Sequence, residues 1–457
     1  MHKSISAQSK RSRTLCGKVK KCVRYILLYI LIAILCYGAM YLAGLIPTSA
    51  LTAHTRETSE ILFKERNYPQ MLEQDVQQFR MDNFSEALII MHSYFLDSKL
   101  TPSSVLLNSA WRNPDPSSNN TPVDNLAQAL SGDWEPPTGT RSHYWMGFRT
   151  IVRPLLAFTN LHGIRRLIQS VFFAVFFICV ILIAKRVSTW CAAAFGLSVM
   201  AVYPFVVSNS LQFSCDFLLA FSGIIAVILM YPHCESGEGI IFLILGQLTQ
   251  YFDFYTTPIL TWGMPFLVLY ALHYKREPNQ SLGAQLRLLF GTLSIWLLAY
   301  GGMWLIKMIL VTVGSSHNGF SILKSFLYYT GIEQNRSGVN YIGVAEALKR
   351  NYENMNSGIH LLFYGSFALS AVIAAVYKYI SQRKRQLDAR LSPAKMRMHF
   401  AVLLCAAVPI IWLACARQAA GTHQWYQYRS LALAVFAFAY WWYLFLHSVA
   451  ARAGAAK

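Results

Sequence analysis

The sequence is short of charged residues, which make up only 13% of its 457 positions. A soluble globular domain carries about 25% of such residues, so the deficit argues for a chain that is solvated by lipid. Acidic residues are the scarcer kind, with 21 Asp and Glu against 40 Lys and Arg. The basic residues lie mostly in short stretches between apolar blocks, which is typical of cytoplasmic loops in membrane proteins. The net charge of +19 therefore does not predict a nucleic-acid partner.

Several motifs of soluble proteins are also absent. The nine cysteines show neither CxxC nor Cys/His zinc spacing, and no phosphate-binding loop or dinucleotide fingerprint occurs. These absences argue against a zinc module and against a soluble, nucleotide-dependent catalytic domain. A cleaved signal peptide is not indicated, because the apolar run from Val23 exceeds a signal core and no small-residue cleavage site follows it. The run is predicted to be an uncleaved membrane anchor.

Long apolar segments are what the sequence has in abundance. Because about 20 apolar residues cross a bilayer as a helix, the segments predict an all-α polytopic membrane protein with about ten transmembrane helices. The predicted order is a basic cytoplasmic N-terminus at 1–22, a first transmembrane helix at 23–46, an external loop with surface helices at 47–166, and a helix bundle at 167–457. Within the bundle, an external loop is predicted at 313–357 and a cytoplasmic basic loop at 381–398. The expected location is the cell membrane, with both termini cytoplasmic.

The apolar region 240–274 is interrupted by polar and aromatic residues around Asp253. One continuous helix would bury this aspartate in lipid, so two short helices with Asp253 at their connection are predicted. The basic pairs at 185–186 and 275–276 should both face the cytoplasm, and only two helices here give the even number of crossings required. An acidic residue at membrane depth costs at least about 2.5 kcal/mol, which makes Asp253 a candidate catalytic residue. The alternative is an exposed aspartate in a turn.

Two more charged residues, Asp216 and Lys307, lie inside apolar blocks near the predicted outer ends of their helices. One interpretation is that the two residues form an ion pair. The other is that Lys307 extends its ammonium group outward to the membrane surface. The sequence leaves both interpretations open.

In the first external loop, the apolar spacing between residues 71 and 100 predicts an amphipathic helix that lies on the outer membrane surface. Asp82 and Glu86 are one helical turn apart on its polar face. Two such carboxylates are candidate catalytic groups, since one can act as a general base and the other as a ligand for a hydroxyl or a metal ion. The alternative is an ordinary solvated helix face.

Arginines and aromatic residues alternate at the end of this loop and recur in the last external loop. These arginines are predicted to lie outside, against the usual distribution of positive charge. They either anchor the chain at the lipid headgroups or bind a phosphate-bearing substrate through their forked donors. The candidate substrate-binding residues are Arg141, His143, Trp145, Arg149, Arg153, His423, Tyr426 and Arg429.

The layout of one helix, a long external loop with an acidic residue, and many helices with short loops resembles the GT-C superfamily. These polytopic glycosyltransferases use polyprenyl-phosphate sugar donors. The resemblance implies that Asp82 is the acidic residue of the first loop, although Asn83 follows it and no paired-acid motif is present. It also implies transfer of a sugar to a glycan or lipid-linked acceptor on the outer face, with a divalent cation as an optional cofactor.

Other functions remain open at this stage. A flippase or transporter of lipid-linked sugars would need polar residues at the bilayer midplane, and a polysaccharide polymerase would differ mainly in its acceptor. A non-catalytic scaffold is the fourth alternative. The transferase hypothesis requires that segments 47–166, 251–257 and 417–430 converge on the non-cytoplasmic side and form one pocket. The polyprenyl chain needs a lipid-facing groove, and the aromatic connection around Asp253 is a candidate border for it.

Overall fold

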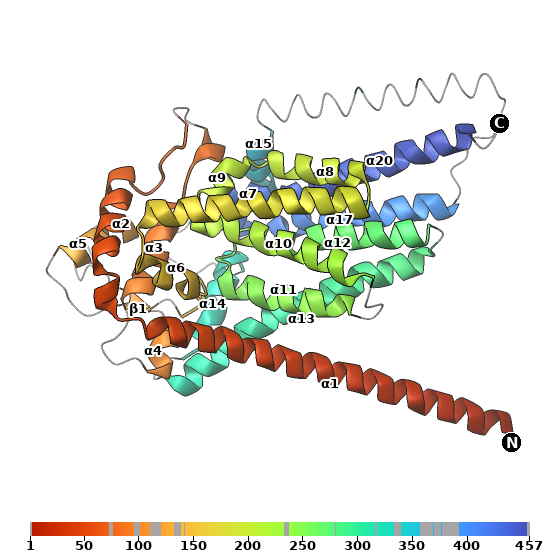
Figure 1. Ribbon diagram of the computed structural model, residues 1–457, viewed down its shortest axis with the longest axis horizontal. Coiled ribbons are helices and arrows are strands. Elements are labelled where there is room, and N and C mark those ends of the chain that lie inside the picture. Colours follow the sequence, from red (N-terminus) through yellow and green to blue (C-terminus); the bar gives the residue numbers. More distant parts are fainter. Residues whose placement is uncertain are drawn as a thin grey trace.

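The computed structural model is dominated by α-helices, and β1 (Ser109–Ala110) and β2 (Gly139–Thr140) form a short antiparallel pair. It describes residues 2–72, 76–95, 101–107, 109–110, 120–131, 139–140, 142–232, 237–278, 280–315, 318–332, 340–356, 369, 376 and 393–454. Long helices lie side by side in a bundle, and a layer of shorter helices covers one end of it (Figure 1). The start of α1 (His2–Gly44) and the end of α20 (Ala432–Gly454) lie at the opposite end.

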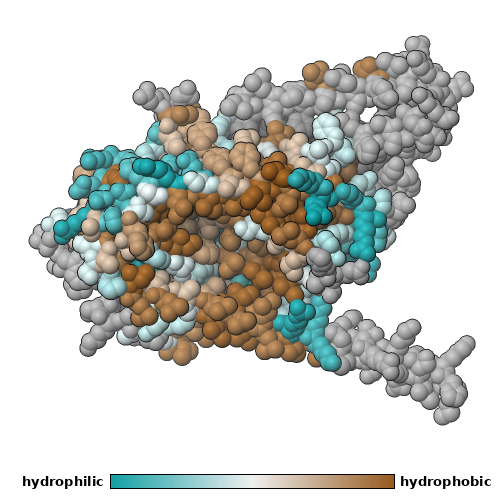
Figure 2. Space-filling model, in the orientation of Figure 1, coloured by the Kyte–Doolittle hydropathy of each residue, from teal (hydrophilic) through white to brown (hydrophobic). Residues whose placement is uncertain are grey.

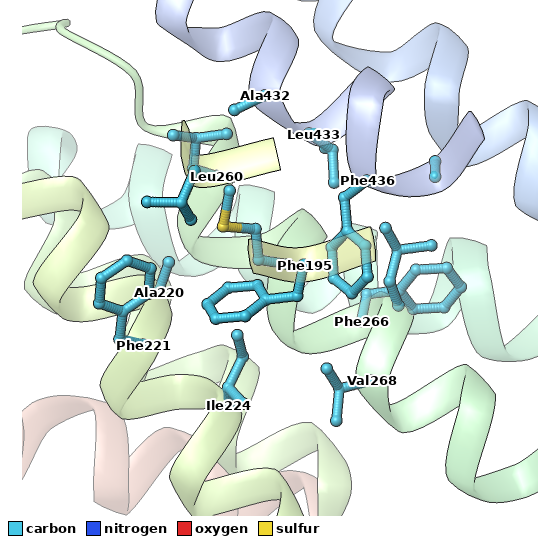
Figure 3. Packing of buried hydrophobic residues seen from close by; sticks show 14 of the residues in the cluster. Phe195, Ala220, Phe221, Ile224, Leu260, Phe266, Val268, Ala432, Leu433 and Phe436 are labelled. Atoms are coloured by element: carbon cyan, nitrogen blue, oxygen red, sulfur yellow. The ribbon is translucent and has the colours of Figure 1, made fainter. Parts of the chain in front are cut away.

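The bundle is held together by apolar helix faces. Besides α1 and α20, its main helices are α7 (Leu161–Arg186), α8 (Thr189–Met200), α10 (Leu211–Met230), α11 (Glu238–Phe252), α12 (Ile259–Arg276), α13 (Leu282–Gly314) and α17 (Pro393–Cys415). Helix α10 packs between α7 and α12, α11 packs on α13, and α20 packs on α8 and α17. Phenylalanines from α8, α10, α12 and α20 lie in the core, where the Phe195 ring makes edge contacts with the rings of Phe221 and Phe436 (Figure 3).

Within the described residues, four helices are long and apolar enough to cross a bilayer: Val19–Gly44, Leu161–Arg186, Leu211–Met230 and Leu282–Gly314. Large apolar side chains on α1, α7 and α13 are exposed, among them Leu27, Phe177 and Leu298. Figure 2 shows a brown hydrophobic band across the middle of the molecule, with teal hydrophilic residues gathered toward its two ends. An exposed apolar band of this kind is what a lipid-embedded protein presents. The all-helical membrane architecture is supported, while the predicted total of about ten crossings exceeds the helices that meet these criteria.

The predicted pair of short helices at 240–274 is confirmed. Helix α11 ends at Phe252, α12 begins at Ile259, and Asp253 lies in the connection. Of the two interpretations of Asp253, the exposed turn residue is wrong, because Asp253 is only 6% exposed. Residues 253–258 are all buried.

The first predicted external loop folds into the layer at the end of the bundle. Its elements are the 3-10 turns η1 (Thr48–Ala50) and η2 (Gln77–Phe79) and the helices α2 (Thr52–Glu65), α3 (Asn83–Tyr94), α4 (Pro102–Leu107), α5 (Pro122–Leu130) and α6 (Arg149–Leu156). The surface helix predicted for residues 71–100 is wrong. Asp82 caps α3 and fixes its start, and α3 is buried against α2, α5 and α6.

The later connections also pack against the bundle. The predicted external loop 313–357 contains α14 (Ser321–Tyr329) and α15 (Val344–Met355). Both contact α18 (Arg417–Thr422), which leads through α19 (Gln424–Gln427) and η3 (Tyr428–Leu431) into α20. A short helix, α9 (Pro204–Ser208), joins α8 to α10. Residues 357–392, apart from residues 369 and 376, lie outside the described residues, and they include most of the predicted basic loop 381–398.

Candidate functional site

A cavity of about 150 Å³ lies where the layer of short helices meets the bundle. Its walls come from the first loop, from the α11–α12 connection, from the segment before α20, and from α10 and α14. The prediction that segments 47–166, 251–257 and 417–430 meet in one pocket is confirmed by this lining. The lining residues are Tyr68, Asp82, Phe84, Ser85, Leu88, Tyr144, Met146, Gln212, Phe254, Tyr255, Tyr329, Ala419, His423, Tyr426 and Gln427.

Asp82 is the one charged side chain in this described lining, and it is 3% exposed. As the N-cap of α3, it accepts hydrogen bonds from the Ser85 amide at 3.0 Å and the Ser85 hydroxyl at 2.9 Å. Burial raises the pKa of Asp82 from 3.8 to about 6; the two Ser85 hydrogen bonds oppose this shift, and the nearby Glu86 adds to it. The Asp82 carboxylate is therefore mostly ionised at neutral pH, yet basic enough to accept a proton from a bound hydroxyl.

Two residues of the cavity lining have a strained backbone. Met146 has φ 60° and Tyr255 has φ 61°, a left-handed conformation that costs a non-glycine residue about 1–3 kcal/mol. Between the two segments, the Gly147 amide donates to the Tyr251 carbonyl at 2.9 Å. A Cβ at Gly147 would lie 2.5 Å from that carbonyl oxygen, so only glycine permits this approach. The hydrogen bond between Gly147 and Tyr251 thus joins the first loop to the end of α11.

Tyrosines make up much of the cavity wall. The hydroxyls of Tyr144 and Tyr329 are 2.9 Å apart, and the Tyr255 ring lies 5.6 Å from that of Tyr144 and 5.1 Å from that of Tyr329. On the last segment, Tyr426 stacks on His423 with ring centroids 5.3 Å apart. Such side chains combine flat apolar faces with hydroxyl groups, which suits a ligand that has both apolar faces and hydroxyls.

His423, predicted to bind substrate, lines this wall and is half-buried. Burial lowers the pKa of the His423 imidazole to about 4, so the ring is neutral at physiological pH. Its Nδ1 atom has no hydrogen-bond partner among the described residues. Of the predicted substrate-binding residues, His423 and Tyr426 are the two that line the cavity.

The predicted phosphate-binding arginines of the first loop have a different role. Arg149 Nε donates to the His92 carbonyl at 2.7 Å, and Arg153 Nη1 donates to the carbonyls of Ser93 and Tyr94. These carbonyls end α3, where the helix dipole is negative and the last C=O groups lack partners within the helix. Neither arginine lines the cavity. Both alternatives from the sequence, headgroup anchoring and phosphate binding, therefore give way to helix capping.

The remaining predicted ligands also lie outside the cavity lining. Trp145 is buried, and its indole Nε1 donates to the Met303 carbonyl at 3.0 Å. Arg429 is fully buried, with its guanidinium 4.4 Å from the centre of the Phe213 ring and a 3.1 Å hydrogen bond to the Gln78 carbonyl. His143 is half-buried, with its ring 4.2 Å from that of Tyr144. Arg141 lies outside the described residues.

Glu86 does not form a catalytic pair with Asp82. It is completely buried and turned toward α7, where Arg165 donates to its Oε2 at 2.7 Å. Its Oε1 accepts the Leu211 amide at 3.0 Å. Both carboxylate oxygens are therefore occupied by structural partners, and Glu86 is absent from the cavity lining.

Asp253 lies behind the cavity wall rather than in it. Its Oδ1 accepts the Thr256 amide at 2.7 Å, while the neighbouring Asp216 accepts both the amide and the hydroxyl of Thr257. Asp216 and Lys307 do not form an ion pair, because Lys307 Nζ donates to the Leu106 carbonyl and lies 5.3 Å from the centre of the Trp145 ring. The two aspartates thus hold the α11–α12 connection in place.

Among the described residues, no group of three or more His, Cys, Asp or Glu side chains is arranged to hold a metal ion. A second hollow of about 750 Å³ lies between α1 and the start of α11, lined by apolar residues with Lys20 and Arg24. It also touches Met230 at the end of α10, whereas the first cavity touches Gln212 at the start of α10. The two spaces therefore lie toward opposite ends of the bundle.

The chain matches no family model, no curated protein and no solved structure. The chemistry of the cavity is therefore interpreted from its own residues. Sequence reasoning missed the glutamines Gln212 and Gln427, because a neutral amide inside an apolar segment produces no anomaly of charge. It also missed the tyrosines of the first loop and of α14, since aromatic residues occur throughout this sequence. The available signal was that these tyrosines lie close in the sequence to a proline or a glycine.

Proposed function

We propose that the protein is a membrane glycosyltransferase that moves a sugar from a polyprenyl-phosphate donor to an acceptor on the outer face of the membrane. The observation that carries this proposal is the buried carboxylate of Asp82, with a pKa of about 6, in a cavity whose other described walls are uncharged and rich in tyrosine. A water-poor site with one tuned base and many hydroxyl-compatible groups suits the activation of an alcohol.

In the proposed reaction, Asp82 accepts the proton of an acceptor hydroxyl. The acceptor oxygen forms a bond to the anomeric carbon of the sugar, and the bond from that carbon to the phosphate oxygen breaks. Polyprenyl phosphate leaves with the bonding electrons and keeps its chain in the bilayer. No nucleotide site is needed, because the donor carries its own activated leaving group.

The leaving phosphate requires a cation, and Arg149 and Arg153 are engaged with backbone carbonyls. We place this role on Arg80, whose guanidinium lies 5.8 Å from the centre of the Trp425 ring. The Trp425 ring in turn contacts the cavity residue Tyr68 at 5.4 Å. Within the described part of the chain, Arg80 Nε has no hydrogen-bond partner, so this guanidinium keeps donor capacity for a phosphate oxygen.

The proposed topology has both termini in the cytoplasm, about ten crossings and the cavity on the outer side. The start of α1 and the end of α20 lie at the same end of the bundle, as an even number of crossings requires (Figure 1). The cavity lies toward the other end, next to the layer formed by the first loop.

The test is sugar transfer by the purified chain in proteoliposomes that contain radiolabelled polyprenyl-phosphate-linked hexoses and pentoses. The wild-type protein should release label from at least one donor, and Asp82→Asn should slow this release about 100-fold or more. Asparagine still caps α3, so the variant should remain folded. Gln247→Leu, at a buried glutamine away from the cavity, is the control and should retain activity. Label that crosses the bilayer while still attached to its carrier would favour a flippase instead.

A further inference from the structure

Two buried glutamines of the cavity lining hold their side-chain amides in a fixed orientation. Gln427 is 1% exposed, and its Nε2 donates to the Tyr255 carbonyl. A backbone carbonyl can only accept, so the amide nitrogen of Gln427 must face it and the amide oxygen must point elsewhere. That oxygen, Oε1, is buried and has no hydrogen-bond partner within the described residues.

The orientation of Gln212 is fixed by a chain of hydrogen bonds that ends at Asp253. Gln212 is 2% exposed, and its Nε2 lies 3.0 Å from the Thr256 hydroxyl. That hydroxyl is also hydrogen-bonded to the Asp253 carboxyl group, which takes the Thr256 amide at 2.7 Å as well. With its proton directed to Asp253, the Thr256 oxygen accepts from Gln212. Because Nε2 of Gln212 is bound to Thr256, its Oε1 atom points away from Thr256. This oxygen also has no hydrogen-bond partner among the described residues.

These oxygens call for hydrogen-bond donors on the ligand. A buried acceptor without a partner costs about 1–3 kcal/mol, a penalty that a ligand hydroxyl removes on binding. Asp82 adds a charged acceptor, and no Lys or Arg is found in the described lining. A carboxylate on the sugar ring would meet acceptors and one negative charge with no cation in the described lining, which disfavours uronic acids. The phosphate of the proposed donor would lie outside the cavity, toward Arg80. The cavity of about 150 Å³ holds on the order of ten water-sized groups, close to the size of one sugar ring.

We propose that this cavity binds one neutral monosaccharide unit through its hydroxyl groups, with the carbonyl oxygens of Gln212 and Gln427 as selectivity-determining acceptors. Asp253 is a positioning residue in this scheme, since it orients Gln212 through Thr256 without touching the ligand. The inference rests on the proposed glycosyl transfer for the origin of the sugar, and it excludes uronic acids from the cavity.

The experiment measures the binding of free monosaccharides to the full chain in detergent by saturation-transfer NMR titration. The panel contains glucose, galactose, mannose and arabinose, the singly deoxygenated forms of each hexose, and glucuronate and galacturonate. The wild-type protein should bind at least one neutral sugar about tenfold more tightly than its uronate. Gln212→Leu and Gln427→Leu should each weaken that sugar about tenfold, the cost of one lost hydrogen bond in a buried site.

A structural defect and a recognition defect give different results in this panel. Each glutamine variant should lose discrimination against one deoxy sugar, the one that lacks the hydroxyl it contacts, whereas a misfolded site would weaken all sugars equally. Gln247→Leu is the matched control, because Gln247 is buried, donates to the Tyr29 carbonyl at 2.9 Å and lies outside the cavity lining. Asp253→Asn should reduce the preference for the neutral sugar over its uronate, because Asn can donate to Thr256 and allow Gln212 to reverse.

Uronates binding as tightly as neutral sugars, or unchanged deoxy-sugar discrimination in both glutamine variants, would overturn the inference. Refutation of the proposed transferase function would give a different result from refutation of this inference. Neutral-sugar binding without any transfer would refute the transferase and leave the inference intact. Transfer of a uronic acid would support the transferase and refute the inference.

Discussion

Two buried polar regions lie on either side of the start of α3, and they differ in how completely their hydrogen bonds are satisfied. In the first, the Arg165 guanidinium binds Glu86 at 2.7 Å, Glu65 at 2.9 Å and Asn83 at 2.8 Å, and we call this the Arg165 network. In the second, the cavity, Gln212 and Gln427 keep carbonyl oxygens without partners among the described residues. The network has no capacity left for a ligand, whereas the cavity does. Hydrogen-bond saturation therefore distinguishes polar groups that only hold the fold from polar groups that can still bind a ligand, although both regions are charged and buried.

The largest effect is expected from breaking the Arg165 network. Arg165→Met leaves Glu86 buried at 0% exposure without its cation, which should cost about 3–5 kcal/mol of folding free energy. The measurement is thermal unfolding of the detergent-solubilised chain, followed by size-exclusion chromatography.

The matched control is Lys349→Ala, which removes an exposed ion pair with Glu353 and should leave the unfolding midpoint unchanged. A variant at Arg165 as stable as the wild type would show that the network contributes little and that the contrast between the two regions is invalid.

The pH dependence of the unfolding free energy tests whether the cavity raises the pKa of the buried Asp82 carboxyl group. Because burial raises the pKa of Asp82 from 3.8 to about 6, the folded chain binds this proton more tightly than the unfolded chain. The resulting stabilisation is fully present below about pH 4 and is lost as the pH rises through about 6. Compared with the Asp82→Asn variant, the wild-type protein should lose up to about 3 kcal/mol of unfolding free energy as the pH rises between these limits. Parallel stability profiles for the two proteins would mean that Asp82 titrates normally.

A smaller effect is expected at Arg153, which tests whether an arginine caps a helix or binds phosphate. Arg153→Met removes donors from the carbonyls of Ser93, Tyr94 and Ile46, which should destabilise the fold by about 1–3 kcal/mol. The KM for the polyprenyl-phosphate donor should stay within twofold. A rise in KM of about tenfold or more with unchanged stability would restore the phosphate-binding interpretation.

The sequence predicted those features that follow from local composition and charge. The helix pair around Asp253 followed from the even number of crossings between two basic pairs, and the meeting of the first loop with the two later segments in one cavity was also predicted. The separate roles of Asp82 and Glu86 were not predictable, because they depend on where α3 begins: the cap residue faces the cavity, and the residue one turn later faces Arg165.

The arginine partners were beyond sequence reasoning for a related reason. Arg149 binds a carbonyl 57 residues earlier in the chain, at the end of a helix whose position the sequence misplaced. Backbone carbonyls carry no residue-type signal, so a buried arginine that caps a helix has the same sequence pattern as one that binds phosphate. The amide acceptors at the cavity became visible only through the hydrogen bonds that fix their orientation.

The central claim is that the cavity beside Asp82 is the substrate site, and the most direct test is an electron cryo-microscopy map of the full chain in a nanodisc with a polyprenyl-phosphate-linked hexose. The account predicts density for the sugar ring between Asp82, Gln212 and Gln427, with the phosphate beside Arg80. A sugar located in the hollow between α1 and α11, or a phosphate bound to Arg149 or Arg153, would contradict it.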